Sequence, residues 1–189
     1  MENRAVTFSQ TQTILNGVNV PNVQLDDIQA ILNMRDAWRF LLDSLEKPLT
    51  LDYICTLNGY IARNEALSWG KLRTGSVGIS GTDYLPPVPT FETASTELQA
   101  ILENNTTVTD KALSVFLWGV KGQLFWDGNK HTSMTAANKL LSAGAGMLTI
   151  LDKDMEQFNT LLLNYYSNDN QDTLKEFLYS NCIQGIAFE

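Results

Sequence analysis

Hydrophobic residues recur every three or four positions along most of the chain, which is the spacing of amphipathic helices. This pattern predicts helices over about 25–45, 91–104, 110–123, 153–167 and 172–184. A further helix over about 50–66 begins after Thr50, whose side chain can cap it. Another follows residue 129 and ends at Gly144 and Gly146. With only a short strand expected within 147–151, the pattern predicts an all-α fold.

Residues 69–90 interrupt the helical pattern. Turn-forming residues exclude a helix there: Gly70, Gly75, Gly78, Gly81, Pro86, Pro87 and Pro89. Within this segment the residues Ser76, Val77, Gly78, Ile79 and Ser80 alternate as in a short strand. A helix-free segment of about 20 residues inside a compact domain is often functional.

The chain has 189 residues, which suits a single domain with a sizeable core. Residues 1–24 are polar and rich in turn formers, so we expect an N-terminal arm packed on the helical domain 25–189. On the inner face of the helix after residue 129 lies Asn138, an amide that needs a partner if it is buried.

Composition excludes several classes of protein. Hydrophobic residues make up 44% and charged residues 18%, as in a globular chain. The net charge of −8 argues against nucleic-acid binding, which needs a basic surface. No apolar run approaches the roughly 20 residues of a membrane span, and the start lacks a signal region. Cys55 and Cys182 fit a reduced protein, so we expect a cytoplasmic location and no membrane partner.

The turn Asp127-Gly128-Asn129 lies directly between two helical runs. The amides of Gly128, Asn129 and Lys130 at a helix start can bind an anion, since they are unpaired and at the positive end of the dipole. Asp127 can hold a divalent cation on a phosphate. The segment therefore suggests a nucleotide-phosphate site, and it contains no obvious general base. The alternative interpretation is a plain turn with a helix cap.

Residues 123–134 resemble the motif of the Fic/Doc family, His-x-Phe-x-Asp/Glu-Gly-Asn-Gly/Lys-Arg-x-x-Arg. Here the segment reads Gln-Leu-Phe-Trp-Asp-Gly-Asn-Lys-His-Thr-Ser-Met. Residues 72–81, continuing to Pro86 and Pro87, resemble the flap of that family. The order and spacing of the two segments make the match fairly specific. The resemblance implies a Fic-like helical domain with a short β-hairpin flap.

The resemblance also implies an activity. Family members use ATP and Mg²⁺ to move part of the nucleotide, commonly AMP, onto a hydroxyl of a target protein. The motif His acts as the base, the acidic residue holds Mg²⁺, and the Gly-Asn turn with the Arg residues binds phosphate. The flap docks a target segment by strand addition, which residues 76–80 would do in this chain.

This chain departs from the motif at three positions. Gln123 replaces the catalytic His, and a carboxamide cannot take up a proton near neutral pH. His131 stands at the first Arg position, where a neutral imidazole offers one donor instead of a bidentate fork. Met134 stands at the second and cannot bind phosphate by charge. The predicted site residues are thus Gln123 as a degenerate catalytic position, Asp127 for metal, and Gly128, Asn129, Lys130 and His131 for nucleotide.

Three functions stay open at this point. The favoured one is a nucleotide-binding protein with impaired AMP transfer. The others are an active transferase of AMP or a phosphate group that uses another base or donor, and a non-catalytic protein-interaction domain. Among single residues, Gln123 is expected to satisfy buried polar groups, and Phe125 and Trp126 to pack in the core. Arg73 is expected to be a surface charge.

Overall fold

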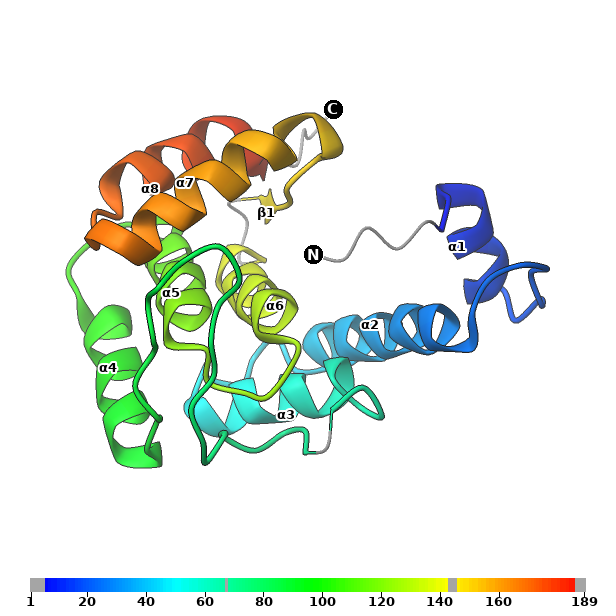
Figure 1. The fold of residues 1–189 in the computed structure, drawn as a ribbon, viewed down its shortest axis with the longest axis horizontal. Coiled ribbons are helices and arrows are strands. Elements are labelled where there is room, and N and C mark those ends of the chain that lie inside the picture. The colour runs from blue at the N-terminus through cyan, green and yellow to red at the C-terminus, as the bar shows by residue number, and fades with distance from the viewer. Residues whose placement is uncertain (1–5, 67, 143–145, 186–189) are drawn as a thin grey trace.

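The chain folds into packed helices, as the hydrophobic pattern predicts. The computed structural model describes residues 6–66, 68–142 and 146–185 (Figure 1). Within these ranges the α-helices are α1 Phe8–Leu15, α2 Leu25–Asp43, α3 Leu51–Ile61, α4 Phe91–Glu103, α5 Val108–Gly122, α6 Asn129–Leu141, α7 Met155–Asn168 and α8 Asp172–Phe177. A 3-10 turn, Asp152–Asp154, precedes α7, and a π-turn, Leu178–Cys182, follows α8. The all-α prediction is confirmed.

Threonine side chains begin four of the helices. Thr50, as expected, accepts a hydrogen bond from the Tyr53 amide at 3.2 Å and caps α3. Thr90 and Thr107 cap α4 and α5 in the same way. Thr7 forms a capping box with Gln10 at the start of α1, a helix that the sequence analysis did not predict.

Two predicted helices are shorter than expected. The helix after Thr50 ends at Ile61 instead of 66, and the chain then passes through Asn64 at a φ of 64°. The helix expected over 172–184 gives way after Phe177 to the π-turn and then to a strand, β2 Ile183–Gln184. This strand pairs antiparallel with β1 Met147–Leu148, so tertiary pairing overrides the local helical pattern. Gly144, an expected helix end, lies outside the described residues.

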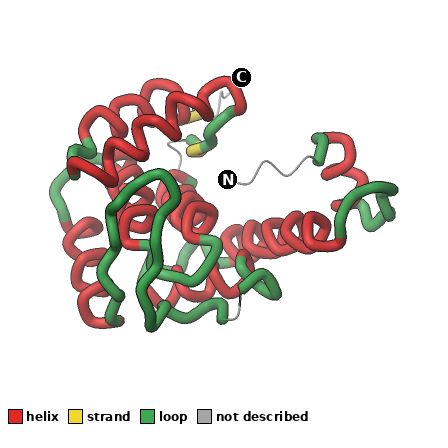
Figure 2. Tube along the Cα trace, in the orientation of Figure 1, coloured by secondary structure: helices red, strands yellow, loops and turns green. Residues whose placement is uncertain are grey.

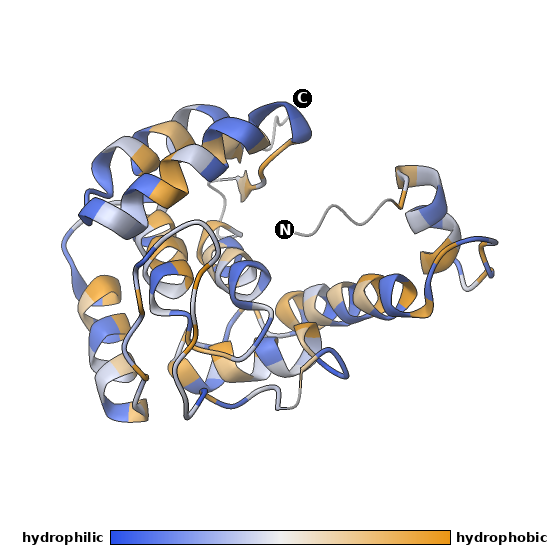
Figure 3. Cartoon of the chain, viewed as in Figure 1, coloured by the Kyte–Doolittle hydropathy of each residue, from blue (hydrophilic) through white to orange (hydrophobic). Residues whose placement is uncertain are grey.

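The core consists of two clusters of buried hydrophobic residues, and α5 contributes to both. One cluster joins α5 and α6 to α7 and α8 through residues that include Phe116, Leu141 and Phe158. The other joins α5 and α6 to α3 and α4 through residues that include Leu57 and Leu98. Hydrophobic residues, orange in Figure 3, accordingly recur along these helices. The α5–α6 pair is therefore the frame that positions the loop between its two members.

The N-terminal arm contains α1, which packs against α2 at the end that projects from the rest of the fold (Figure 1). In the described part of the chain, no helix combines the length and the apolar character that a membrane span requires.

The segment 69–90 contains no helix, as predicted, and runs as a long loop across the α5–α6 side (Figure 2). The strand expected over 76–80 is not formed, because the described residues offer no ladder partner there. The short antiparallel sheet lies instead at β1 and β2. The predicted alternation is nevertheless visible in burial. Val77 and Ile79 are half-buried, whereas residues 76, 78 and 80 are exposed.

Asn138 has the partner that its buried position requires. Its Nδ2 donates to the Leu148 carbonyl at 2.9 Å, and its Oδ1 accepts from the Leu148 amide at 2.7 Å. One side chain thereby holds β1 on α6.

Asn138→Ala is expected to destabilise the fold by about 1–3 kcal/mol, because both Leu148 groups lose their buried partner. Urea denaturation followed by circular dichroism measures the loss. Ser142→Ala, at an exposed position just after the same helix, is the control and should stay within about 0.5 kcal/mol of the native chain. Equal midpoints for Asn138→Ala and Ser142→Ala would show that the Asn138 bonds contribute little.

Candidate functional site

The loop between α5 and α6, residues 123–128, is closed by the side chain of Asn129. Asn129 Oδ1 accepts from the Phe125 amide at 2.9 Å, and its Nδ2 donates to the Phe125 carbonyl at 2.8 Å. Both bonds are buried, and Phe125 itself is only 2% exposed, as expected for a core residue. Asn129 thus satisfies the backbone of the turn from within and fixes its shape.

Gly128 requires the absence of a side chain for two reasons. Its φ of 73° is in the left-handed region, which favours glycine. A Cβ at this position would also lie 3.2 Å from Ile61 Cγ2 and 3.3 Å from Ala62 Cβ. The loop therefore rests directly on the C-terminal end of α3.

Asn58 of α3 holds the α5–α6 loop in place through hydrogen bonds. Its Nδ2 donates to the Asp127 carbonyl at 2.9 Å and to Thr132 Oγ1 at 3.2 Å. Its Oδ1 accepts from the Gly70 amide at 2.8 Å. One fully buried amide therefore connects the loop, α6 and the start of the 69–90 segment.

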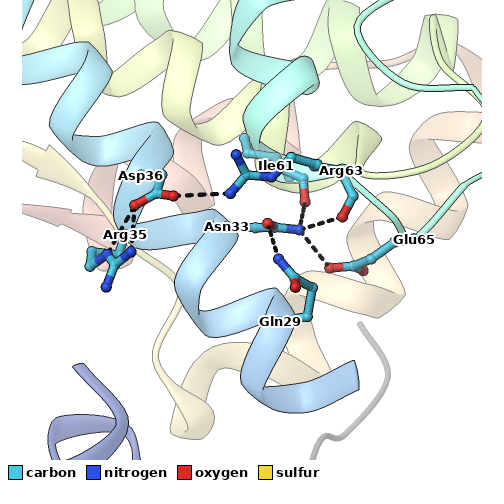
Figure 4. A network of polar contacts seen from close by, with 7 residues as sticks. All are labelled: Gln29, Asn33, Arg35, Asp36, Ile61, Arg63 and Glu65. Carbon is cyan, nitrogen blue, oxygen red and sulfur yellow. Dashed lines mark hydrogen bonds and ion pairs between the residues drawn. The ribbon is translucent and has the colours of Figure 1, made fainter. Parts of the chain in front are cut away.

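A polar network supports the end of α3 on which Gly128 rests (Figure 4). Asn33 of α2 donates to the carbonyls of Ile61 at 3.3 Å and Arg63 at 2.7 Å, and it accepts from Gln29 at 2.7 Å. Arg63 in turn pairs with Asp36 at 3.0 Å. The free carbonyls at the end of α3 are thereby satisfied by α2.

The start of α6 presents backbone donors beside a carboxylate. The first backbone bond of the helix runs from Thr132 to the Gly128 carbonyl at 2.8 Å, so the amides of Asn129 and Lys130 precede the hydrogen-bonded ladder. The N-cap residue, Gly128, has no side chain to cap this end. The exposed Asp127 accepts from the Gly128 amide through Oδ1 at 2.6 Å, so this amide, expected to be unpaired, already has a partner. A negative charge at this end is stabilised by the helix dipole.

The carboxylate of Asp127 can hold Mg²⁺ only with help from a ligand. Among the described residues, no group of three or more His, Cys, Asp or Glu side chains is placed to bind a metal ion. Mg²⁺ is commonly held by one or two carboxylates together with phosphate oxygens and water. An exposed Asp127 beside the backbone amides of a helix start fits that donor set.

Gln123 ends α5 in the left-handed conformation, with a φ of 44°. Its Nε2 donates to the Val120 carbonyl at 2.7 Å, and the Tyr166 hydroxyl donates to the same carbonyl at 3.2 Å. The carboxamide therefore satisfies the end of α5, which agrees with its expected role in pairing buried polar groups. Burial raises the pKa of Tyr166 to about 12, so this neighbouring hydroxyl stays protonated near neutral pH.

The two positions of the missing arginines differ in their surroundings. His131 is half-buried in the first turn of α6, next to the half-buried Lys130. Met134 packs against the cluster of α5 to α8, together with Ile79 and Tyr84 from the 69–90 segment. Lys130 is consequently the one residue of the expected nucleotide-binding set that carries a fixed positive charge.

The flap, defined as residues 72–87, turns at Gly81, where φ is 86°. A Cβ on Gly81 would lie 3.1 Å from Leu163 Cδ2, so the tip rests on α7. Within residues 76–85, the described backbone bonds include only the turn from Thr82 N to Ile79 O at 3.4 Å. Most backbone groups of these extended arms are not used in a ladder, which is the condition for strand addition.

Two expectations about single residues are wrong. Trp126 is 42% exposed instead of buried in the core, and its ring lies against Gly75 of the flap. Arg73 is not a surface charge, since it is only 1% exposed and bonded to backbone carbonyls of the flap and of α5. The importance of Arg73 and of Asn58 depends on partners about 50 and 70 residues away, so no local pattern could reveal it.

Comparison with solved structures identifies the architecture. A Fic family protein from Desulfovibrio desulfuricans G20 superposes with a TM-score of 0.80 at 16% identity, covering 95% of this chain and 57% of that one. The chain has the Fic fold. Fic-1 from C. elegans matches with a TM-score of 0.76 at 20% identity, over 94% of this chain and 55% of that one. This chain therefore spans a little over half the length of these two structures.

A third structure carries a nucleotide analogue. The BepC protein of Bartonella tribocorum, a VirB-translocated effector solved with bound AMPPNP, has a TM-score of 0.57 at 12% identity. The match covers 78% of this chain and 83% of that one. No protein-family model and no curated protein matches the sequence. The Fic fold expected from residues 72–87 and 123–134 is thus confirmed at the level of structure.

Proposed function

We propose that the chain binds a nucleotide through its phosphates at the start of α6 and transfers AMP to protein hydroxyls poorly. The observation that carries this proposal is the amide-lined start of α6 beside exposed Asp127, on a loop fixed by Asn58 and Asn129. The shared fold with BepC, a protein solved with bound AMPPNP, supports nucleotide binding in general. Lys130 would add a positive charge for phosphate.

Impaired transfer follows from the surroundings of Gln123. Its side chain cannot act as a base, and its amide group is engaged by the Val120 carbonyl. Tyr166, its neighbour, is protonated near neutral pH, and burial raises its pKa further, to about 12. The stabilising charge of two arginines is replaced by His131 and by the packed Met134. The site therefore retains groups for binding and lacks groups for the chemical step.

The flap supports docking of a protein segment. Its arms are extended, and their outer residues are exposed. A target strand would bind through backbone groups, which tolerates varied target sequences. This feature also favours the second candidate, a non-catalytic interaction domain that recruits a protein segment along the flap.

Calorimetric titration with ATP tests the role of Asp127. With Mg²⁺ present, Asp127→Ala is expected to lower ATP affinity by about ten-fold or more, which corresponds to about 1.4 kcal/mol. Without Mg²⁺ the same change removes a negative charge beside the phosphates, so affinity should stay equal or rise. The two effects have opposite signs, which separates metal binding from general damage.

Asp52→Ala is the matched control, because Asp52 is an exposed carboxylate in the first turn of a different helix, α3. It should leave both titrations unchanged. Equal ATP affinity with and without Mg²⁺, in the native chain and in Asp127→Ala, would remove the metal role of Asp127. Absence of any ATP binding by the native chain would leave the interaction-domain candidate.

A further inference from the structure

Arg73 is a buried cation whose guanidinium is bonded to backbone carbonyls. It donates through Nε to Gln123 at 2.5 Å and through Nη1 to Gly75 at 2.6 Å. Its Nη2 donates to Pro87 at 2.6 Å, with longer contacts to Pro86 at 3.2 Å and Gly122 at 3.4 Å. Burial lowers the pKa of Arg73 from its usual value. Because the usual pKa of a guanidinium is very high, Arg73 keeps its positive charge.

The acceptors of Arg73 come from three separate segments. Gly75 belongs to the first arm of the flap, Pro86 and Pro87 end the second arm, and residues 122–123 form the end of α5. The Arg73 amide also donates to the Leu124 carbonyl at 2.9 Å. One planar group with five donors therefore joins both arms of the flap to the loop that leads into α6. A lysine, with three donors on a single nitrogen, cannot reproduce this fork.

A second contact between the flap and the loop provides a reporter. A Cβ on Gly75 would lie 2.8 Å from Trp126 Cη2, so the first arm crosses the indole ring at close range. Trp126 immediately precedes Asp127 and is partly exposed. Any displacement of the flap relative to the loop changes the surroundings of this ring.

We infer that Arg73 is the positioning residue that fixes the flap relative to the start of α6. Arg73 would thereby set the distance between a protein segment docked on the flap and a phosphate bound at Gly128–Lys130. Arg73 itself would contact neither of them. The role of Arg73 in ligand binding rests on the proposed function. The physical link between flap and loop, however, can be measured without any ligand.

The test uses ¹⁹F NMR of the full chain labelled with 5-fluorotryptophan. The chain has four tryptophans, and Trp126→Phe assigns the line of interest. Arg73→Lys is expected to shift and broaden the Trp126 line, and Arg73→Met to do so more strongly. The lines of the other tryptophans should move less. The graded order follows from five, three and no donors in the side chain.

Lys139→Met is the matched control. Lys139 is a second buried cation bonded to backbone carbonyls, those of Ser44 and Leu45 at 3.0 and 2.9 Å. It joins α6 to the end of α2 and has no bond to the flap. Its loss is expected to lower the melting temperature and leave the Trp126 line in place, which separates positioning from general stability.

The outcomes are distinct. An unchanged Trp126 line in both Arg73 variants, with the fold intact, would overturn the inference. If Arg73→Met does not fold, Arg73→Lys decides alone, since it keeps the charge. Adding ATP and Mg²⁺ to the same samples tests the proposed function separately. Absence of any ligand response in the native chain would contradict that function, whereas the ligand-free shift in Arg73→Lys would still support the positioning role.

Discussion

The triple variant Gln123→His, His131→Arg, Met134→Arg is expected to transfer labelled nucleotide about 10²–10⁴-fold faster than the native chain, since a general base contributes a factor of this size. An imidazole at position 123 can take the proton of a target hydroxyl, and two guanidinium groups can stabilise phosphate charge in the same transition state. Histidine also tolerates the left-handed backbone found at this position. The assay is transfer from labelled ATP onto a cell lysate or onto the protein itself.

Partial restoration should give a partial effect. Gln123→His alone supplies the base but leaves His131 and Met134 as poor phosphate ligands, so we expect a smaller gain. Gln123→Asn is the matched control, because it accepts the same backbone conformation and supplies no base. Met134 packs against the core, so a thermal melt must show that the triple variant is folded. A native chain that transfers as fast as the triple variant would favour an active transferase with another base or donor.

Gly119→Ala is expected to destabilise the chain by about 1–3 kcal/mol, the usual result of adding volume to a close-packed interface. The new methyl group would overlap Ser133 Oγ and lie 3.0 Å from Ser133 Cβ. Ser133 Oγ donates to the Asn129 carbonyl at 2.7 Å, so moving it away breaks a buried bond at the start of α6. Chemical denaturation measures the loss, and ATP titration should show weaker binding because α6 is displaced.

Gly122→Ala is the control in the same helix. Its Cβ would meet only the tip of Leu124, at 3.3 Å, and alanine favours the helix by up to about 1 kcal/mol over glycine. It should therefore be neutral or stabilising. If Gly119→Ala also raises the melting temperature, helix propensity outweighs the contact with Ser133, and the close α5–α6 approach is less rigid than the structure indicates.

The sequence predicts the helices well, because each buries one face and this imposes a spacing of three or four residues. The starts of α3 and α4 and the end of α5 fall within a residue of the expected positions. The failures occur where a distant partner decides the outcome. Helical structure after residue 172 ends at Cys182 instead of 184, because Ile183 and Gln184 pair with residues 147 and 148.

The site is predicted in part for the same reason. The turn at 127–129 and its place before a helix are local features, so the sequence locates them. The groups that hold the turn, Asn58 and Arg73, act across the fold and give no local signal. Helix α1 is a different case, because its start signal, the capping box of Thr7 and Gln10, is local and present in the sequence.

The most direct test of the central claim is amide NMR of the ¹⁵N-labelled native chain titrated with ATP and Mg²⁺. The largest shifts are expected at the amides of Asn129 and Lys130, and at the Gly128 amide as its bond to Asp127 changes. The start of α4, where Thr90 caps the Thr93 amide at 3.1 Å, offers an internal comparison and should remain unchanged. Saturable shifts at residues 128–130 would support phosphate binding at the start of α6. Shifts concentrated elsewhere, with these three amides unmoved, would contradict it.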